Sequence, residues 1–415
     1  MSHVPVFTLG ELKLFAAFSI FLTSYFVFAV GKFPGMKIDR PGAAIIGAVL
    51  MVAFGIVRPD AALSAIDFKT IVLLFSMMLI VATLHLAGFF DGITRWVVEH
   101  LRPRHLLPTV IFLSGVLSAF FVNDIICLAM VPFVLTATRR MGVKPLPYLL
   151  AVATASNIGS VATITGNPQN MLIGSYSGIG YLVFLAHLGP VALAGLFLDW
   201  LILSKAFPTT EPTHPPKVET GSVETREPVR LVKPGIVILI VLAGFLAGVP
   251  PAMMAAFGAA MMLITRTREP RQVYEEVDWG LLVFFAGLFV IIQGAQNAGI
   301  TDDLLHFARP LGIQSAGVFT VVTAVLSNIV SNVPAVMLLK SMVPQFTNPH
   351  LGWLVLAMAS TLAGNLTITG SVANIIVVER SRDVEEISFG DYFRVGLPIT
   401  VLTLVVGSVW LWWIK

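Results

Sequence analysis

The stretch SNIGSVATITGNPQN at residues 156–170 places helix-interrupting residues inside an otherwise apolar helix. Gly159, Gly166 and Pro168 favour breaks in the backbone, while asparagines and threonines supply neutral polar groups. A second version, AGNLTITGSVAN, occurs at residues 363–374 and shares the tetrapeptide TITG. Broken backbone within a bilayer survives only where protein or a water-filled cavity satisfies the freed N–H and C=O groups. The two stretches therefore predict a paired polar site.

The composition of the whole chain favours a polytopic membrane protein. The 415 residues are 56% hydrophobic and only 12% charged, against about 25% charged in an average soluble domain. This argues against a cytosolic enzyme, a secreted disulfide scaffold, a disordered chain and a nucleic-acid binder. The single cysteine, Cys127, excludes an internal disulfide and a multi-thiolate metal site. We expect no enzyme, no cofactor and no metal, since neither an HExxH motif nor a Ser/His/Asp constellation occurs.

Continuously apolar runs predict membrane-spanning α-helices, because the alternation typical of a β-barrel is absent. The predicted spans are 12–31, 42–57, 70–88, 107–138, 146–175, 180–204, 234–249, 252–265, 280–299, 315–343, 351–377 and 395–414. A segment rich in Pro, Thr and Glu separates them into two sets and predicts a solvated linker. We divide the chain into an N-terminal transmembrane helix (1–40), a first repeat (41–204), a cytoplasmic linker (205–233) and a second repeat with its leading helix (234–415).

The two halves align with each other in register. A shift of 211 residues pairs Asp67 with Asp278, a shift of 209 pairs Asn123 with Asn332, and a shift of 204 superposes the two TITG stretches. Chance similarity between apolar stretches would not keep Asn, Asp and Gly in the same order. The matches therefore predict an internal repeat.

Two of the runs, 107–138 and 315–343, are too long for one crossing and are interrupted by polar residues, Asn123 and Asn332 among them. Each run can be a very long helix, two crossings or a re-entrant hairpin. Placing both as re-entrant hairpins gathers most loop lysines and arginines on one side, which the positive-inside rule assigns to the cytoplasm. The linker then lies in the cytoplasm, and the C-terminus lies on the outer side of the cell membrane. The arms, at about 15 residues, are short for full crossings.

The predicted fold class is thus an all-α membrane protein with about ten transmembrane helices plus two re-entrant helical hairpins. Five crossings in each half make the two repeats inverted relative to each other. Inverted repeats with discontinuous helices near the midplane are typical of secondary transporters. The first hairpin enters from the cytoplasm and the second from outside, so we expect the tips with Asn123 and Asn332 to meet near the middle of the membrane.

Four breaks supply the candidate chemistry: the two hairpin tips and the two unwound stretches, the first of which contains Asn157. Half-helix N-termini suit an anion or oxyanion, whereas freed carbonyls and amide oxygens suit a small cation. The alternative is that these amides only join one helix to another.

Asp124, directly after the first tip, is the candidate proton-coupling residue. A carboxylate inside the membrane is costly and marks a functional site by default. Burial disfavours its charged form, so that Asp124 is expected to take up a proton. Its repeat counterpart is Val333, which shows that the fold itself needs no charge there. The alternative is a structural cap of the second hairpin arm. Asp67 and Asp278 fall at the ends of spans and are interpreted as caps.

The paired motifs and the tips FVNDIICLAMVP and LSNIVSNVPAVML resemble the ion transporter superfamily over about residues 40–410. This superfamily includes arsenite permeases of the ArsB type, divalent anion/sodium symporters and NhaD-type sodium/proton antiporters. The order of Asn before Asp in the first tip is most similar to the arsenite permease and anion permease branch. The resemblance implies a scaffold, a moving transport region and often a homodimer. It also implies that solute contacts Asn123, Asn332, Thr165, Asn167, Asn170, Thr369 and Asn374.

The expected function is secondary-active export of a small inorganic solute, with arsenite or antimonite favoured as in arsenical resistance. Proton antiport by an elevator-like or rocking movement would drive it, with Asp124 as the coupling site. The alternatives are a proton- or sodium-coupled uptake permease for a carboxylate or inorganic anion, a sodium/proton antiporter, and a channel. ATP-driven pumping would need a separate ATPase subunit, since the chain lacks a phosphate-binding loop with a lysine.

Overall fold

The computed structural model describes residues 9–208, 231–264, 269–308, 310 and 312–414. In this part of the chain the regular elements are α-helices and short 3-10 helices, with one isolated β-bridge between Lys32 and Asp39. The predicted linker 205–233 lies for most of its length outside the described residues. Only its ends are described: α10 runs on to Ala206 and α11 begins at Val232.

The described residues of the first half form ten α-helices. They are α1 (Leu9–Val30), α2 (Arg40–Ala53), α3 (Pro59–Ala65), α4 (Phe68–Leu86), α5 (Phe89–His100), α6 (Pro103–Phe120), α7 (Asn123–Met141), α8 (Leu146–Ser160), α9 (Pro168–Ser177) and α10 (Tyr181–Ala206).

The second half repeats this series. Its helices are α11 (Val232–Leu246), α12 (Pro251–Leu263), α13 (Pro270–Glu275), α14 (Trp279–Asn297), α15 (Ile300–Ala308), α16 (Ala316–Val330), α17 (Asn332–Leu339), α18 (Pro349–Leu362), α19 (Val372–Ser381) and α20 (Phe389–Trp413). The 3-10 helix η2 (Lys340–Gln345) continues α17, while η3 (Ala363–Asn365) and η4 (Ile368–Gly370) lie between α18 and α19. Each described α-helix of the first half therefore has a counterpart ten α-helices later in the same order, which confirms the predicted repeat architecture.

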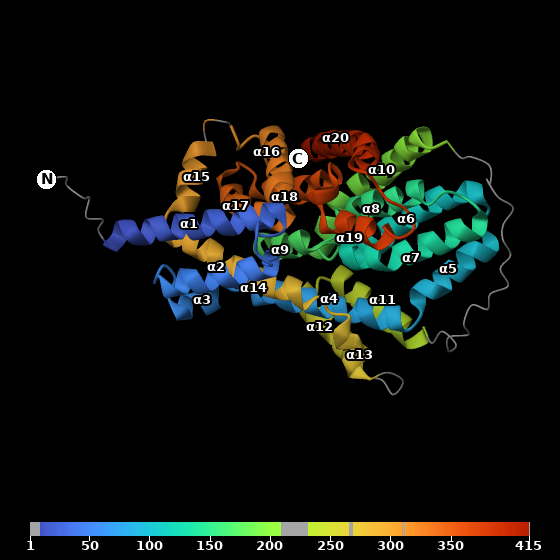
Figure 1. Ribbon diagram of the computed structural model, residues 1–415, viewed down its shortest axis with the longest axis horizontal. Helices are drawn as coiled ribbons and strands as arrows, with labels where there is room; N and C mark the ends of the chain where they lie inside the picture. Colours follow the sequence, from blue (N-terminus) through green and yellow to red (C-terminus); the bar gives the residue numbers. More distant parts are fainter. Residues whose placement is uncertain (1–8, 209–230, 265–268, 309, 311, 415) are drawn as a thin grey trace.

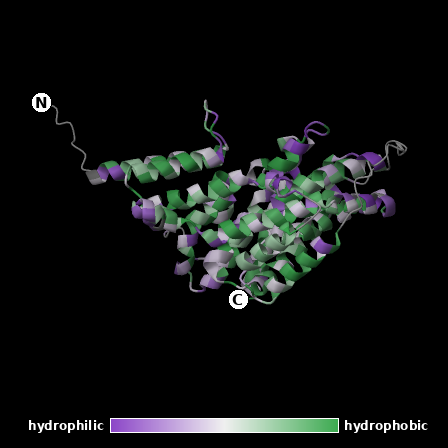
Figure 2. Cartoon of the chain, turned by 90° about the horizontal axis from the view of Figure 1, so that it is seen from below, coloured by the Kyte–Doolittle hydropathy of each residue, from purple (hydrophilic) through white to green (hydrophobic). Residues whose placement is uncertain are grey.

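The helices have the length and hydropathy of membrane spans. Within the described ranges, six helices are long and apolar enough to cross a bilayer: α1, α4, α6, α10, α14 and α20. Shorter apolar helices, α2, α11, α12 and α16, add to them. Figure 2 shows hydrophobic residues along most of the helices and hydrophilic residues gathered at their ends and connections. The all-α membrane fold predicted from composition is confirmed.

Both long runs are broken at their predicted tips. α6 ends at Phe120 and α7 begins at Asn123, while α16 ends at Val330 and α17 begins at Asn332. Figure 1 shows α6 and α7 side by side toward the right-hand end of the molecule, with α16 and α17 left of its centre. The arms of the first hairpin, at 18 and 19 residues, are longer than the sequence suggested, because α6 already begins at Pro103.

The helices form two packed groups. The scaffold helices are α1, α2, α4, α12 and α14. Among them α2 packs on α14, and their repeat counterparts α12 and α4 pack on each other. The hairpin bundle comprises α6–α10 and α16–α20, in which α6 packs on α8, α16 on α18 and α10 on α20. Close approach depends on glycine: a Cβ on Gly159 of α8 would overlap the backbone of Gly115 in α6.

Candidate functional site

A cavity of about 220 Å³ lies where the scaffold helices meet the hairpin bundle. It is lined by residues at, or directly before, the starts of six helices. These are α2 and α14 from the scaffold, and α7, α9, α17 and α19 from the bundle. The polar residues of its wall include Arg40, Asn123, Asp124, Gln169, Asp278, Asn332 and Ser371. Helix N-termini carry partial positive charge and free N–H groups, so this wall favours oxygen atoms of a solute.

Asn123 stands at the first tip and is 3% exposed. Its backbone N–H donates to the carbonyl of Gly166 at 3.0 Å, and its Nδ2 donates to Oδ1 of Asn157 at 3.0 Å. Its own Oδ1 is buried and has no hydrogen-bond partner. A buried amide oxygen without a donor is unfavourable. Asn123 also lines the cavity, so this unsatisfied oxygen belongs to a residue of the cavity wall.

Asn332 stands at the second tip in an equivalent setting. Ser331, directly before it, has a φ of 76° and is the one non-glycine residue with a positive φ in the described part of the chain. It marks the break between α16 and α17. In the amide orientation that its neighbours favour, Asn332 donates to the carbonyls of Ser360 at 3.0 Å and Gly370 at 3.2 Å. Both tips therefore contact the TITG glycine of their own repeat, Gly166 or Gly370, and both face one cavity.

Asp124 is half-buried at the cavity wall and belongs to a cluster of three charges. Its carboxyl accepts a hydrogen bond from the backbone N–H of Ala373, in the first turn of α19. Arg40 and Asp278 are close enough to interact with it electrostatically. Arg40 is fixed by its Nε, which donates to the carbonyl of Phe28 at 3.0 Å. The first hairpin thus places the carboxyl group of Asp124 near two charged groups of the scaffold, Arg40 and Asp278.

The unwound segments are held by two repeat-related asparagines. Nδ2 of Asn170 donates to the carbonyls of Ser160 and Thr163, both at 3.0 Å. Nδ2 of Asn374 donates to the carbonyls of Gly364 at 2.7 Å and Thr367 at 3.0 Å. Donors and acceptors in both sets are related by the same shift of 204 residues. These amides replace the helical N–H donors that the breaks remove.

A hub of hydrogen bonds behind the cavity joins the first hairpin tip to the unwound stretches of both repeats. Asn157 donates to Oδ1 of Asn365 and Oδ1 of Asn374, both at 2.9 Å. Its own Oδ1 accepts from Asn123 and from Ser371, both at 3.0 Å. Its repeat counterpart, Thr361, accepts at 3.2 Å from Nδ2 of Asn167 and from Nε2 of Gln169.

The structure brings three of the predicted site residues to the cavity: Asn123, Asn332 and Asp124. It does not bring Asn157, Thr165, Asn167, Asn170, Thr369 or Asn374 to the wall. Thr165 is buried and hydrogen-bonds the hydroxyl of Tyr181 at 2.9 Å, and Thr369 is exposed beside Thr367 at 3.4 Å. The amides of Asn157, Asn167, Asn170 and Asn374 are occupied by hydrogen bonds within the protein.

Sequence reasoning missed Arg40, Asp278, Gln169 and Ser371. Arg40 lies between the predicted spans 12–31 and 42–57 and counted only among the loop arginines that the positive-inside rule places in the cytoplasm. Asp278 is indeed a cap, accepting from the N–H of Leu281 at 2.9 Å, yet it also lines the cavity. Gln169 and Ser371 belong to the quoted motifs, so their positions beside the breaks were a signal that could have identified them as cavity residues. Arg40 and Asp278 had none, because no local pattern shows which helix ends converge.

Comparisons with known proteins agree with this architecture. Residues 25–363 match the citrate transporter family, CitMHS. An uncharacterised transporter of Mycobacterium tuberculosis strain H37Rv is 30% identical over 426 residues, covering 95% of this chain and 98% of that protein. The silicon efflux transporter LSI3 of Oryza sativa subsp. japonica is 28% identical, covering 90% and 92%. A transporter named arsB from Dictyostelium discoideum is 26% identical, covering 90% and 87%.

Among solved structures, the YdaH transporter of Alcanivorax borkumensis, described as having an unusual topology, has a similar fold. It matches with a TM-score of 0.57 over 97% of each chain, at 15% sequence identity. The inverted arrangement of hairpins and broken helices around one cavity, together with these matches, identifies the chain as a membrane transporter that belongs to the CitMHS citrate transporter family of the ion transporter superfamily.

Proposed function

We propose that the protein exports a small, uncharged polyhydroxylated inorganic solute in exchange for protons, with arsenite or antimonite as the favoured solute. The observation that carries this proposal is the charge balance of the cavity: one guanidinium, Arg40, faces two carboxyl groups, Asp124 and Asp278, among neutral amides. An undissociated hydroxide of arsenic both donates and accepts hydrogen bonds. It therefore suits a wall that holds donors and acceptors side by side.

The solute contacts follow from the hydrogen-bonding capacity of each group. Hydroxyl groups of the solute donate to the carboxylate of Asp124 and to the unpartnered Oδ1 of Asn123. Their oxygen atoms accept from Arg40 and from N–H groups at the helix starts. No thiol is needed, and Cys127 is buried against Ser156 at 3.0 Å rather than at the wall.

Proton coupling follows from competition at Asp124. The ionised carboxylate accepts a hydrogen bond from the solute, whereas the protonated group is a donor and weakens that contact. A proton and a solute molecule therefore exclude each other at one position. Alternating access with exclusive loading gives antiport, and an inward proton gradient then drives export.

Two relatives support this choice of solute. LSI3 is a silicon efflux transporter by name, and the Dictyostelium relative is named arsB. Silicic acid and arsenious acid are both small neutral hydroxides, which a cavity of about 220 Å³ can hold.

An anionic carboxylate is the second candidate. It is favoured by the six helix N-termini around the cavity and by the description of the family as citrate transporters. Citrate carries three carboxylates near neutral pH, while the wall offers one guanidinium against two carboxyl groups. This charge balance makes a polycarboxylate the weaker candidate unless Asp124 and Asp278 are protonated.

Topology, location and assembly stay predictions. We place the protein in the cell membrane with the 205–233 linker in the cytoplasm and the C-terminus outside, following the loop charges. The homodimer implied by the family resemblance, and a separate ATPase subunit, are likewise proposals that purification from the native membrane would test.

Flux measurements in proteoliposomes test the function. Arsenite, silicic acid, a dicarboxylate, citrate and sodium are each offered under an imposed pH gradient or sodium gradient. Uphill movement of arsenite or silicic acid driven only by the pH gradient is expected. Uphill carboxylate movement would favour the second candidate, and movement of sodium against protons alone would favour a sodium/proton antiporter. Flux that no gradient drives uphill would indicate a channel.

A further inference from the structure

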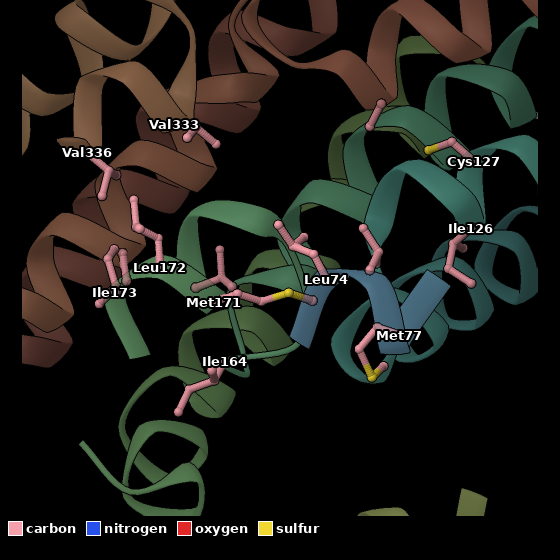
Figure 3. Packing of buried hydrophobic residues seen from close by; sticks show 14 of the residues in the cluster. Leu74, Met77, Ile126, Cys127, Ile164, Met171, Leu172, Ile173, Val333 and Val336 are labelled. Carbon is pink, nitrogen blue, oxygen red and sulfur yellow. The ribbon is translucent and has the colours of Figure 1, made fainter. Parts of the chain in front are cut away.

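Contacts between the scaffold and the bundle differ between the two repeats. α4 packs on α9, and Figure 3 shows Met171 of α9 extending toward Leu74 of α4. The repeat-related helices α14 and α19 make no comparable contact in the described part of the chain, because the cavity lies between them. The molecule is therefore closed at the start of α4 and open at the start of α14.

The two repeat-related capping carboxylates reflect this difference. Both predicted caps are confirmed: Asp67 accepts from the N–H of Lys69 at 3.0 Å and from the hydroxyl of Thr70 at 2.9 Å. Asp278 caps α14 and lines the cavity. Asp67 instead lies within electrostatic reach of Lys340 and Tyr176 in the bundle. Nζ of Lys340 lies 3.8 Å from the centre of the Tyr176 ring.

Inverted repeats allow the opposite conformation to be derived. Exchanging the conformations of the two halves brings α19 onto α14 and opens the cavity at the start of α4. Asp67 then takes the place that Asp278 has now. The shift of 204 residues places Arg380 of α19 where Tyr176 of α9 stands in the present conformation. Arg380 is exposed here and would approach Asp278 after the exchange.

We propose that Lys340 and Arg380 are positioning residues that stabilise opposite conformations of the transporter. Lys340, seated on the Tyr176 ring, covers Asp67 while the cavity faces Asp278; Arg380 covers Asp278 while the cavity faces Asp67. Each scaffold carboxylate thus faces the solute cavity in one conformation and a bundle cation in the other. This proposal concerns alternating access and does not depend on which solute is carried.

The expected size of the effect follows from the interaction between the Lys340 ammonium and the Asp67 carboxylate, which the exchange of conformations separates. A partly exposed ion pair contributes about 0.2–1 kcal/mol, which corresponds to a roughly 1.4- to fivefold change in a conformational equilibrium. Removing Lys340 should move the equilibrium toward the opposite conformation by this factor. Removing Arg380 should move it the other way, a difference in sign that a general loss of stability would not produce.

Paired cysteines measure the two conformations in the full chain, on a Cys127→Ala background. Leu74→Cys with Met171→Cys reports the present conformation through the α4–α9 contact. The repeat-related pair, Phe285→Cys with Ile375→Cys, reports the opposite one. Each pair is treated with a short thiol crosslinker in membranes. Lys340→Met should lower crosslinking of the first pair and raise that of the second, while Arg380→Met should do the reverse.

Conservative variants separate this role from folding. Lys340→Arg and Tyr176→Phe keep the cation and the ring, and should restore the crosslinking pattern of the parent protein. Tyr176→Leu should act like Lys340→Met. Equal loss of both crosslinks in Lys340→Met and Arg380→Met, or a shift of both variants in the same direction, would overturn the proposal. Failure of the second pair to crosslink in any variant would do so as well.

Discussion

Nδ2 of Asn157 in α8 donates to Oδ1 of Asn374 in α19 at 2.9 Å, a contact between residues 217 positions apart. Asn374 in turn donates to two carbonyls of the unwound segment before α19. One buried hub therefore joins the broken helices of both repeats. These hydrogen bonds explain how the hairpin bundle holds irregular backbone inside a membrane.

The first prediction concerns the asparagines that hold the breaks. Asn170→Leu and Asn374→Leu each remove the donor for two buried carbonyls. A buried acceptor left without a donor costs about 1–3 kcal/mol, so both variants should unfold at clearly lower temperature in detergent. Gln293→Ala, which removes only a surface contact with Asn297, serves as the control and should stay within about 0.5 kcal/mol of the parent. Unchanged melting in the Asn374 variant would contradict the structural role.

The second prediction concerns Asn123, whose Oδ1 has no protein partner. Asn123→Ala should raise the KM for solute and lower the melting temperature only slightly, because Asn123 lines the cavity and Oδ1 of Asn157 keeps its hydrogen bond from Ser371. Loss of a hydrogen bond to a neutral group corresponds to about 0.5–1.5 kcal/mol, or roughly a two- to tenfold increase in KM. Initial rates of uptake into inverted vesicles, paired with a melting curve, measure both quantities. A large fall in melting temperature at constant KM would show that the residue is structural only.

The third prediction concerns proton coupling by Asp124. In the parent protein, lowering the pH on the solute-binding side should raise the KM, because protonation removes an acceptor from the cavity. Asp124→Asn should make the KM independent of pH and abolish uphill flux driven by a pH gradient, while leaving downhill flux detectable. Asp60→Asn is the matched control, since Asp60 contacts Arg58 at the surface. Proton-driven accumulation in the Asp124 variant would refute the coupling role.

The fourth prediction concerns Arg40. Its Nε is occupied by the Phe28 carbonyl, which leaves the terminal nitrogens available to the cavity. Loss of a charged donor costs about 1.5–3 kcal/mol, so Arg40→Ala should raise the KM roughly ten- to hundredfold. Arg40→Lys should fall between, because it keeps the charge without the planar fork. Lys37→Ala, an exposed change nearby, should transport normally; equal effects of the Arg40 and Lys37 variants would contradict the assignment.

The fifth prediction concerns packing of α8 on α6. Gly159→Ala would drive a methyl group into the backbone of Gly115, which neither helix can avoid without separating. Little folded protein should survive size-exclusion chromatography. Gly317→Ala is the control: a Cβ there meets no atom within 4 Å, and alanine favours the helix. Normal yield of the Gly159 variant would show that the approach of the two helices is not needed.

The repeat, the broken helices and the two tips were all predictable from sequence. They depend on local signals, namely apolar length, helix-breaking residues and the recurrence of the same motif, which act wherever the segment lies. The same local signals could not separate structural from solute-facing amides. Asn170 and Asn123 have the same side chain beside a break, yet one holds backbone carbonyls and the other faces a cavity.

The sequence by itself determined that the chain is a helical membrane transporter with two related halves and paired polar breaks, because hydrophobic length and breaker residues act locally. Only the tertiary structure decided which charges meet at those breaks. Arg40 and Asp278 lie far apart in sequence from Asp124, and they reach the same cavity because α2 packs on α14 with their N-termini facing the first hairpin. Convergence of helix ends is a property of packing between segments, which no single segment encodes.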